Sequence, residues 1–258
     1  MMDFTHEAYR ALLFSLKRRG YTFYTFEQFL SVPQNGRIIV LRHDIDKRPQ
    51  NALKLARIEH RLGIKASYYI RAVKGTWDEN IIRKIVALGH ELSYHYEDLT
   101  IAKGNHEKAW EHFKINLAKI REFYSAKTIC MHGSPLSKWD NRELWKKYDY
   151  REVGIVGEPY FDIDYSKVLY ITDTGRGWNH TKVSVRDKID HSDNVLQLSI
   201  KGTGQMIEMI ENNNFPDCAI INTHPQRWFP FGVNWVNELL LQSLKNTIKR
   251  LLIWARAH

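Results

Sequence analysis

The sequence predicts an α/β protein whose fold is a distorted (β/α) barrel of the TIM type, with about seven strands. Short apolar segments rich in β-branched residues alternate with amphipathic segments along most of the 258 residues, which is typical of parallel β/α units. The hydrophobic content of 43% is enough for one substantial core. No repeat, low-complexity tract or linker divides the chain, so we expect a single domain over residues 1–258.

The first elements are indicated by their boundaries. An amphipathic helix ends at Gly20, and its apolar face consists of Tyr9, Leu12, Leu13 and Leu16. Thr25 and Gln28 form a capping-box pair that predicts a short helix through Leu30. Residues 37–42 are apolar and β-branched at their centre, which indicates a strand buried on both faces.

Helices and strands then alternate along the chain. The expected helices cover residues 48–62, 78–88 and 105–123, and the expected strands cover 66–71, 90–94 and 127–131. Beyond residue 140 we expect a short helix near 141–147 and extended segments at 151–156, 168–172, 195–200 and 218–223. A further helix opens at Thr203, and the last begins at Asn234 with an apolar stripe of Val236, Leu240, Leu244, Ile248 and Leu251.

Composition limits the partners and the compartment. Lys and Arg number 38 against 29 Asp and Glu, and the formal net charge of +9 favours anionic partners. Because no basic run or nucleic-acid-binding motif accompanies this charge, we expect no nucleic acid partner. We expect no transmembrane segment, because no stretch is long and apolar enough to span a bilayer. Peripheral contact with a membrane remains open, because the last helix carries the basic residues Lys245, Lys249, Arg250 and Arg256. No export signal is found at the start of the sequence, and Cys130 and Cys218 both lie in apolar segments, where buried and reduced thiols are expected. Both observations indicate a cytoplasmic protein.

A pair of aspartates follows the first long strand. Asp44 and Asp46 alternate with Ile45, so their carboxylates face the same side. Two close carboxylates repel unless a cation or a shared proton separates their roles, which favours a metal ligand beside a general base. The alternative is structural: the pair caps the next helix or binds Arg42 and Arg48 at the surface.

Histidines follow three other predicted strands: His95, His132 and His224. Single histidines are usually structural, but in parallel β/α units these positions meet at one edge, where active sites lie. Imidazole together with carboxylate suits a divalent metal, and zinc is the expected one. His90 is a weaker candidate, and His43 is structural because it faces opposite to Asp44.

These residues resemble a known superfamily. The aspartate pair, the Gly-His-Glu at 89–91 followed by His95, and the late His224 resemble polysaccharide deacetylases of carbohydrate esterase family four, the NodB-homology type, over about residues 38–225. The runs CMHGSPLSKWDNRELW and TDTGRGW look closest to the subgroup associated with bacterial lipopolysaccharide O-antigen biosynthesis. The resemblance implies that Asp44 is the catalytic base, Asp46 and His95 are metal ligands, and His224 is the general acid.

The sequence also departs from that superfamily. Its usual second histidine ligand, four residues after the first, is Leu99 here, and its arginine motif after the fourth strand is replaced by residues 132–135. We expect His132 as the third metal ligand, while Glu97 or no third protein ligand remain open. Zinc, cobalt and nickel tolerate the same ligands.

The long loop over residues 157–193 carries a further polar cluster. Arg176 is a candidate to bind a phosphate or carboxylate of the substrate, to orient Asp44, or to pair with Asp173 or Asp187 and order the loop. Trp139, Trp178 and Trp228 either stack on a sugar or fill the core. The expected substrate contacts are Arg176, Asp173, Trp139 and Trp228.

Together these observations predict a metal-dependent hydrolase that removes an N-acetyl or related acyl group from an acetamido sugar, nucleotide- or lipid-linked, in surface polysaccharide synthesis. One alternative is an amide hydrolase for another acyl group, such as a formylated sugar. The other is a non-catalytic carbohydrate-binding relative, which the leucine at position 99 keeps open.

Overall fold

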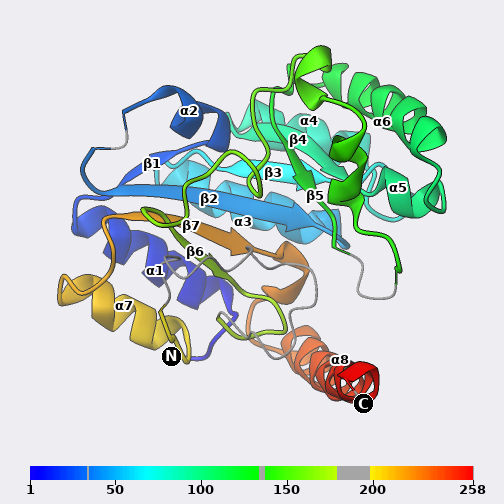
Figure 1. The fold of residues 1–258 in the computed structure, drawn as a ribbon. Coiled ribbons are helices and arrows are strands. Elements are labelled where there is room, and N and C mark those ends of the chain that lie inside the picture. Colours follow the sequence, from blue (N-terminus) through cyan, green and yellow to red (C-terminus); the bar gives the residue numbers. More distant parts are fainter. Residues whose placement is uncertain (34, 134–136, 179–197, 258) are drawn as a thin grey trace.

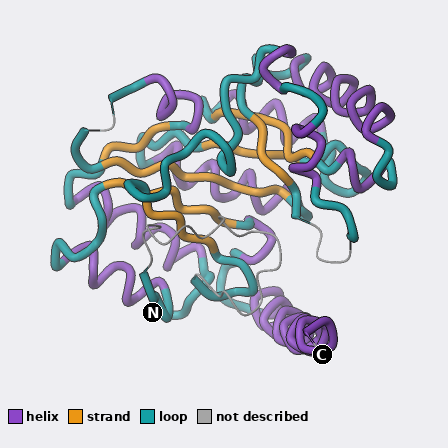
Figure 2. The backbone as a smooth tube through the Cα atoms, in the orientation of Figure 1, coloured by secondary structure: helices purple, strands orange, loops and turns teal. Residues whose placement is uncertain are grey.

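The protein is built around one parallel sheet of seven strands in the computed structural model, which describes residues 1–33, 35–133, 137–178 and 198–257 (Figure 1). The strands are β1 (Thr22–Tyr24), β2 (Ile38–Ile45), β3 (Ser67–Ile70), β4 (Glu91–Tyr96), β5 (Ile129–Met131), β6 (Leu169–Thr172) and β7 (Cys218–Thr223). Their order is β5-β4-β3-β2-β7-β6, and β1 pairs in parallel with the first part of β2. The sheet curls into a half-barrel, which confirms the predicted α/β class (Figure 2).

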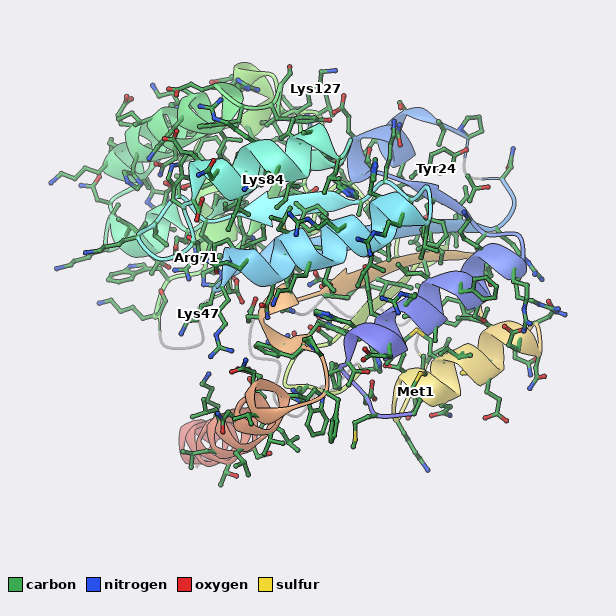
Figure 3. All side chains as sticks on the ribbon, turned by 180° about the vertical axis from the view of Figure 1, so that it is seen from behind. Met1, Tyr24, Lys47, Arg71, Lys84 and Lys127 are labelled. Atoms are coloured by element: carbon green, nitrogen blue, oxygen red, sulfur yellow. The ribbon has the colours of Figure 1, made fainter. Side chains whose placement is uncertain are left out.

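Helices cover the sheet and follow the strands in β/α order. They are α1 (His6–Arg18), α2 (Phe26–Ser31), α3 (Pro49–Arg61), α4 (Glu79–Ala87), α5 (Asp98–Ile101), α6 (His106–Arg121), α7 (Thr203–Glu211) and α8 (Val233–Ala257). Three 3-10 helices are η1 (Asn141–Lys146), η2 (Tyr150–Val153) and η3 (Pro225–Arg227). Seen from behind, α1, α3, α4 and α7 lie over one face of the sheet (Figure 3). In the part of the chain that the structure describes, no helix is long and apolar enough to cross a bilayer.

The central strand, β2, shows why the sequence produces this sheet. All eight of its residues are buried, as expected for a strand covered on both faces. It pairs with β3 on one side and β7 on the other, in a register that places Asp44 beside Tyr69 and His43 beside Thr223. Because every pairing is parallel, the carboxyl ends of the strands lie at one edge of the sheet.

Most predicted elements are confirmed, and the errors are local. The capping box of Thr25 and Gln28 is present at the start of α2, and the predicted strand at 218–223 coincides with β7. The extended segment predicted at 151–156 is wrong, because residues 150–153 form η2 after an Asp149 cap. Residues 198–200 are not a strand, and 195–197 lie outside the described residues. The short β1 and α5 were not predicted.

A buried polar network lies on the helix side of β2. Glu59 of α3 accepts hydrogen bonds from the hydroxyls of Tyr9 (2.6 Å) and Tyr68 (2.7 Å), and its Oε1 lies 3.0 Å from Nε2 of His43. Nδ1 of His43 lies 2.6 Å from the hydroxyl of Thr223. His43 therefore lies on the opposite face of β2 from Asp44, as predicted, and links α3 to β2 and β7.

Candidate active site

Five predicted side chains lie at the carboxyl edge of the sheet. Asp44 is the last residue but one of β2 and Asp46 follows the strand, while His95 lies near the end of β4. His132 comes directly after β5, and His224 directly after β7. The fold thus brings together residues up to 180 positions apart in the chain, since parallel strands end at the same edge.

Three of these residues present ligand atoms to one point. Oδ1 of Asp46 lies 3.4 Å from Nε2 of His95 and 3.1 Å from Nδ1 of His132, and the two nitrogens are 3.2 Å apart. A tetrahedral zinc site with bonds of about 2.0–2.2 Å has ligand atoms about 3.3–3.6 Å apart. The three atoms are therefore spaced close to what one small divalent cation would need, and a four-coordinate cation held by them would keep one position for water or substrate.

The surroundings of Asp46 favour a bound cation beside its carboxylate. Its Oδ1 is buried and accepts no hydrogen bond among the described residues, whereas its Oδ2 accepts one from the Gln226 side chain at 3.1 Å. Burial raises the pKa of Asp46, but the imidazoles of His132 and His95 outweigh it and hold the pKa well below its usual value. An ionised, buried oxygen whose described neighbours are two imidazole nitrogens favours a positively charged ligand between them.

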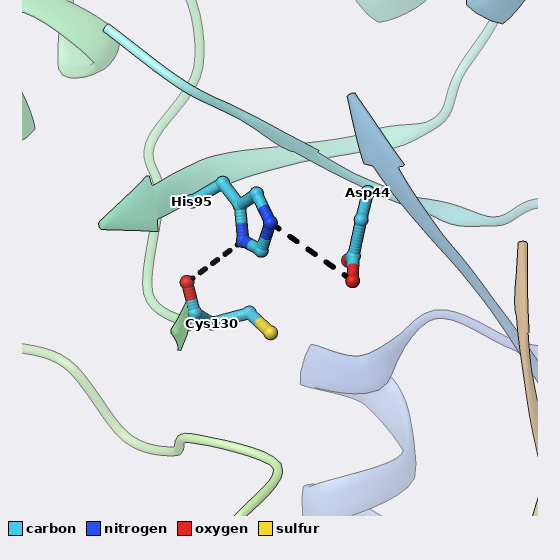
Figure 4. A group of neighbouring side chains, drawn as sticks. All are labelled: Asp44, His95 and Cys130. Carbon is cyan, nitrogen blue, oxygen red and sulfur yellow. Dashed lines mark hydrogen bonds and ion pairs between the residues drawn. The ribbon is translucent and has the colours of Figure 1, made fainter. Parts of the chain in front are cut away.

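The orientation of His95 leaves the correct nitrogen free. Its Nδ1 lies 3.0 Å from the carbonyl oxygen of Cys130, to which it donates, so Nε2 carries the lone pair (Figure 4). Burial lowers the pKa of His95, but the negative charges of Asp44 and Asp46 raise it above its usual value. The two aspartates thus create a negative potential at this imidazole.

A second group of possible ligands shares His95 and consists of Asp44, His95 and Cys130 (Figure 4). It is the weaker candidate because Oδ2 of Asp44 lies 4.0 Å from Nε2 of His95 and both Asp44 oxygens accept other hydrogen bonds. The Cys130 thiol is buried and lies 3.7 Å from the Met131 carbonyl oxygen. A single Nε2 serves one cation, and the group with Asp46 and His132 is the more compact.

The geometry also separates the alternatives for the third ligand. Both oxygens of Glu97 accept hydrogen bonds from the Arg71 guanidinium, at 2.7 and 2.8 Å. Its Oε2 lies 3.9 Å from Nε2 of His132, on the side of that ring away from Asp46. Leu99, at the position of the superfamily's second histidine, is buried in the core. These positions favour His132 over Glu97.

Asp44 is held by a partner on its own strand. The guanidinium of Arg42 donates to both of its carboxylate oxygens, at 2.9 and 2.7 Å, and Asn222 donates to Oδ2 at 3.0 Å. Burial raises the pKa of Asp44, but Arg42, together with His95 and His224, holds it below its usual value. The structural alternative, in which Arg42 binds the aspartates, is therefore correct for Asp44, although the pair is buried and not at the surface. This pairing could have been predicted from the sequence, since positions i and i+2 of a strand share a face.

His224 is oriented by Asp173. Nδ1 of His224 lies 2.6 Å from Oδ1 of Asp173, and the backbone N–H of His224 donates to the same carboxylate. Arg227 and Trp228 donate to it as well, at 2.5 and 2.8 Å. Burial raises the pKa of Asp173, but Arg227 and His224 outweigh it and lower the pKa below its usual value. Nε2 of His224 is left facing Oδ2 of Asp46 at 3.8 Å.

The residues expected to contact substrate are placed differently. Asp173 and Trp228 are fully buried and bonded to each other, so the structure does not present either to an open surface. The guanidinium of Arg176 lies over the rings of Phe4 (5.2 Å) and Trp235 (4.6 Å). The role of orienting Asp44, which was one candidate for Arg176, belongs to Arg42. Trp139 is partly buried and remains a candidate for stacking on a sugar. Asp187 lies outside the described residues.

The fold and site define an α/β half-barrel with a candidate metal centre, an acid candidate and a base candidate at one edge.

No family model matches the chain, and no curated protein matches it. Similar solved structures include a family 4 carbohydrate esterase from Bacillus anthracis, with 11% identity over 91% of this chain and 84% of that one, at a TM-score of 0.44. A CE4 esterase from Streptococcus mutans has 13% identity over 88% and 87%, at 0.47. The peptidoglycan deacetylase PdaC from Bacillus subtilis has 10% identity over 85% and 99%, at 0.40.

Proposed function

We propose that this protein is a metal-dependent hydrolase that removes an N-acetyl or related acyl group from an amino sugar. The observation that carries the proposal is the triangle of Asp46, His95 and His132 ligand atoms, 3.1–3.4 Å apart. Oδ2 of Asp44 lies 4.0 Å from Nε2 of His95, and Nε2 of His224 lies 3.8 Å from the other oxygen of Asp46, Oδ2. Ligands, base and acid within one small volume are what amide hydrolysis requires.

Each residue has a role that its contacts support. A divalent cation, when bound, polarises the acyl carbonyl and makes a water molecule more acidic. Asp44, kept ionised by Arg42, accepts the proton of the attacking water. His224 donates a proton from Nε2 to the departing amine, since an amine anion is too poor a leaving group. Asp173 holds Nδ1 of His224 and thereby fixes which nitrogen carries out the transfer.

The finer assignment rests on the sequence. The runs at 130–145 and 172–178 support a place in O-antigen or related surface polysaccharide synthesis, with zinc as the metal. The substrate would then be a nucleotide- or lipid-linked acetamido sugar in the cytoplasm. A formylated sugar is the second candidate, because the same acid, base and metal residues hydrolyse either amide.

Release of acid from the acyl group tests the proposal directly. Zinc-loaded protein is incubated with N-acetyl and N-formyl amino sugars in nucleotide-linked and in lipid-linked form, and free acetate and formate are measured. We expect acetate release that stops on chelation and returns when zinc is added. A protein that takes up zinc yet releases neither acid from any amino sugar of either linkage would be the non-catalytic, carbohydrate-binding relative.

The third ligand has its own test in zinc titrations. We expect His132→Ala to weaken zinc affinity about 100-fold or more, because the site loses one of three protein ligands. Glu97→Gln serves as the matched control and should change affinity by less than about tenfold, as a neighbour of the ligands only. If His132→Ala binds one equivalent of zinc with undiminished affinity, the assignment of His132 is wrong.

A further inference from the structure

Helix α8 is turned with its polar side toward the protein. Trp235, Glu238, Gln242 and Asn246 follow one another at helical spacing and form the inner face. Asn246 donates to the carbonyl oxygen of Gly175 at 2.7 Å, and Trp235 donates to the carbonyl oxygen of Asp3 at 2.8 Å. These contacts fix the rotation of the helix about its axis.

The opposite face of α8 is apolar and exposed. Val233 is 77% exposed, Leu240 63% and Leu244 60%, and Val236 and Leu241 are also exposed. Phe231, just before the helix, is exposed as well. The apolar stripe predicted from the sequence therefore exists, but its described part faces away from the core. An exposed stripe of large aliphatic side chains on a helix indicates a surface that binds something.

Charge indicates what binds. Between Phe231 and the end of the sequence the one acidic residue is Glu238, which is buried and lies 3.5 Å from the Arg48 guanidinium. Lys245 is exposed, and the sequence of the last two turns and beyond adds Lys249, Arg250 and Arg256. The described part of the helix thus offers exposed apolar side chains beside Lys245 and no exposed carboxylate, and the sequence that follows is basic, which suits an anionic lipid surface.

We propose that the outer face of α8, defined by Phe231, Val233, Val236, Leu240 and Leu244, binds the interface of an anionic membrane. The helix lies parallel to the surface, with its leucines among the acyl chains and its cations among the head groups. A second copy of this chain fits less well, because two such faces would bring lysines and arginines together with no carboxylate to pair them.

Helix α8 lies at the same end of the sheet as the candidate active site (Figure 1). Glu238 contacts Arg48, in the loop that follows Asp46, and Asn246 contacts the turn that follows Asp173. Membrane binding through α8 would therefore hold the catalytic edge near the lipid surface. This consequence is independent of whether the proposed hydrolysis is correct, since it rests on the outer face alone.

Flotation with vesicles tests the proposal. The full chain is mixed with vesicles of phosphatidylcholine alone, or of phosphatidylcholine with phosphatidylglycerol, and bound protein is measured after centrifugation. We expect binding to the anionic vesicles only, and weaker binding at high salt. Leu240→Ser/Leu244→Ser should weaken it about 100-fold, and Lys245→Glu about tenfold.

Matched variants elsewhere on the surface control for general effects. Ile115→Ser, at an exposed isoleucine of α6, and Lys84→Glu, at an exposed lysine of α4, should bind like the unaltered protein. The substituted side chains are exposed, so circular dichroism and thermal unfolding should not change. Failure to bind anionic vesicles overturns the proposal, as does a dimer in light scattering that the double serine variant dissociates, which would assign the face to a second copy.

Discussion

Asp44→Asn is expected to lower kcat for acyl hydrolysis by about 10²–10⁴-fold, the range associated with loss of a general base. An amide cannot accept the proton of the attacking water. Zinc affinity should change little, because Asp44 lies outside the group formed by Asp46, His95 and His132. Activity and zinc titration on the same preparation measure both effects. Because Arg42 helps to hold the pKa of Asp44 below the usual pKa of an aspartate, the base stays ionised at any pH above that usual pKa.

Asp46→Asn is the matched comparison two residues away. It should lose zinc affinity and turnover together, whereas Asp44→Asn should lose turnover alone. Asp44→Asn also removes the countercharge of the buried Arg42, so some loss of thermal stability is expected. If Asp44→Asn loses zinc and Asp46→Asn retains it, the roles assigned to the two aspartates are reversed.

The regular part of the fold could be predicted because its signals are local. Strands buried on both faces, helix caps and the spacing of apolar residues along a helix can each be recognised from about ten to fifteen consecutive residues. The segment at 151–156 failed because its apolar residues fit a strand, whereas the Asp149 cap and Gly154, in the left-handed region, close a 3-10 turn. Strand β1 is three residues long and depends on its pairing with β2.

The same distinction applies to the site. Asp44, Asp46, His95, His132 and His224 could be proposed from the rule that parallel strands end at one edge. Asp173 was expected in the long loop as a substrate contact, and its contact with His224 was not predicted, because that partner lies 51 residues away and depends on β6 lying next to β7. No local pattern encodes that pairing.

The apolar stripe of α8 illustrates a further limit. Its helical period could be predicted, but periodicity does not state which way a stripe faces. The direction is set by Trp235, Asn246 and their distant partners, Asp3 and Gly175. A terminal helix whose stripe faces solvent becomes a candidate binding surface only when those contacts are known.

Glu59→Gln is expected to lower the free energy of unfolding at pH 7 by about 3 kcal/mol, the value of a pKa difference of about 2.5. Burial raises the pKa of Glu59, but His43, His90 and the Tyr9 hydroxyl together lower it from 4.5 to about 2. Glutamine has nearly the same shape but no charge, so the hydroxyls of Tyr9 and Tyr68 and the ring of His43 lose a carboxylate partner in the core.

The sign of the pH dependence separates this effect from a packing defect. A carboxyl whose pKa is lower in the folded than in the unfolded protein stabilises the fold fully above about pH 4.5, and that contribution is lost as the pH falls toward 2. The difference between the original protein and Glu59→Gln should therefore be constant near neutral pH and shrink below 4.5. Urea unfolding across this range measures it, with the exposed Glu122→Gln as the control. A difference that stays the same at every pH would mean that glutamine disturbs packing and that the charge of Glu59 does not stabilise the junction of α1, α3, β2 and β3.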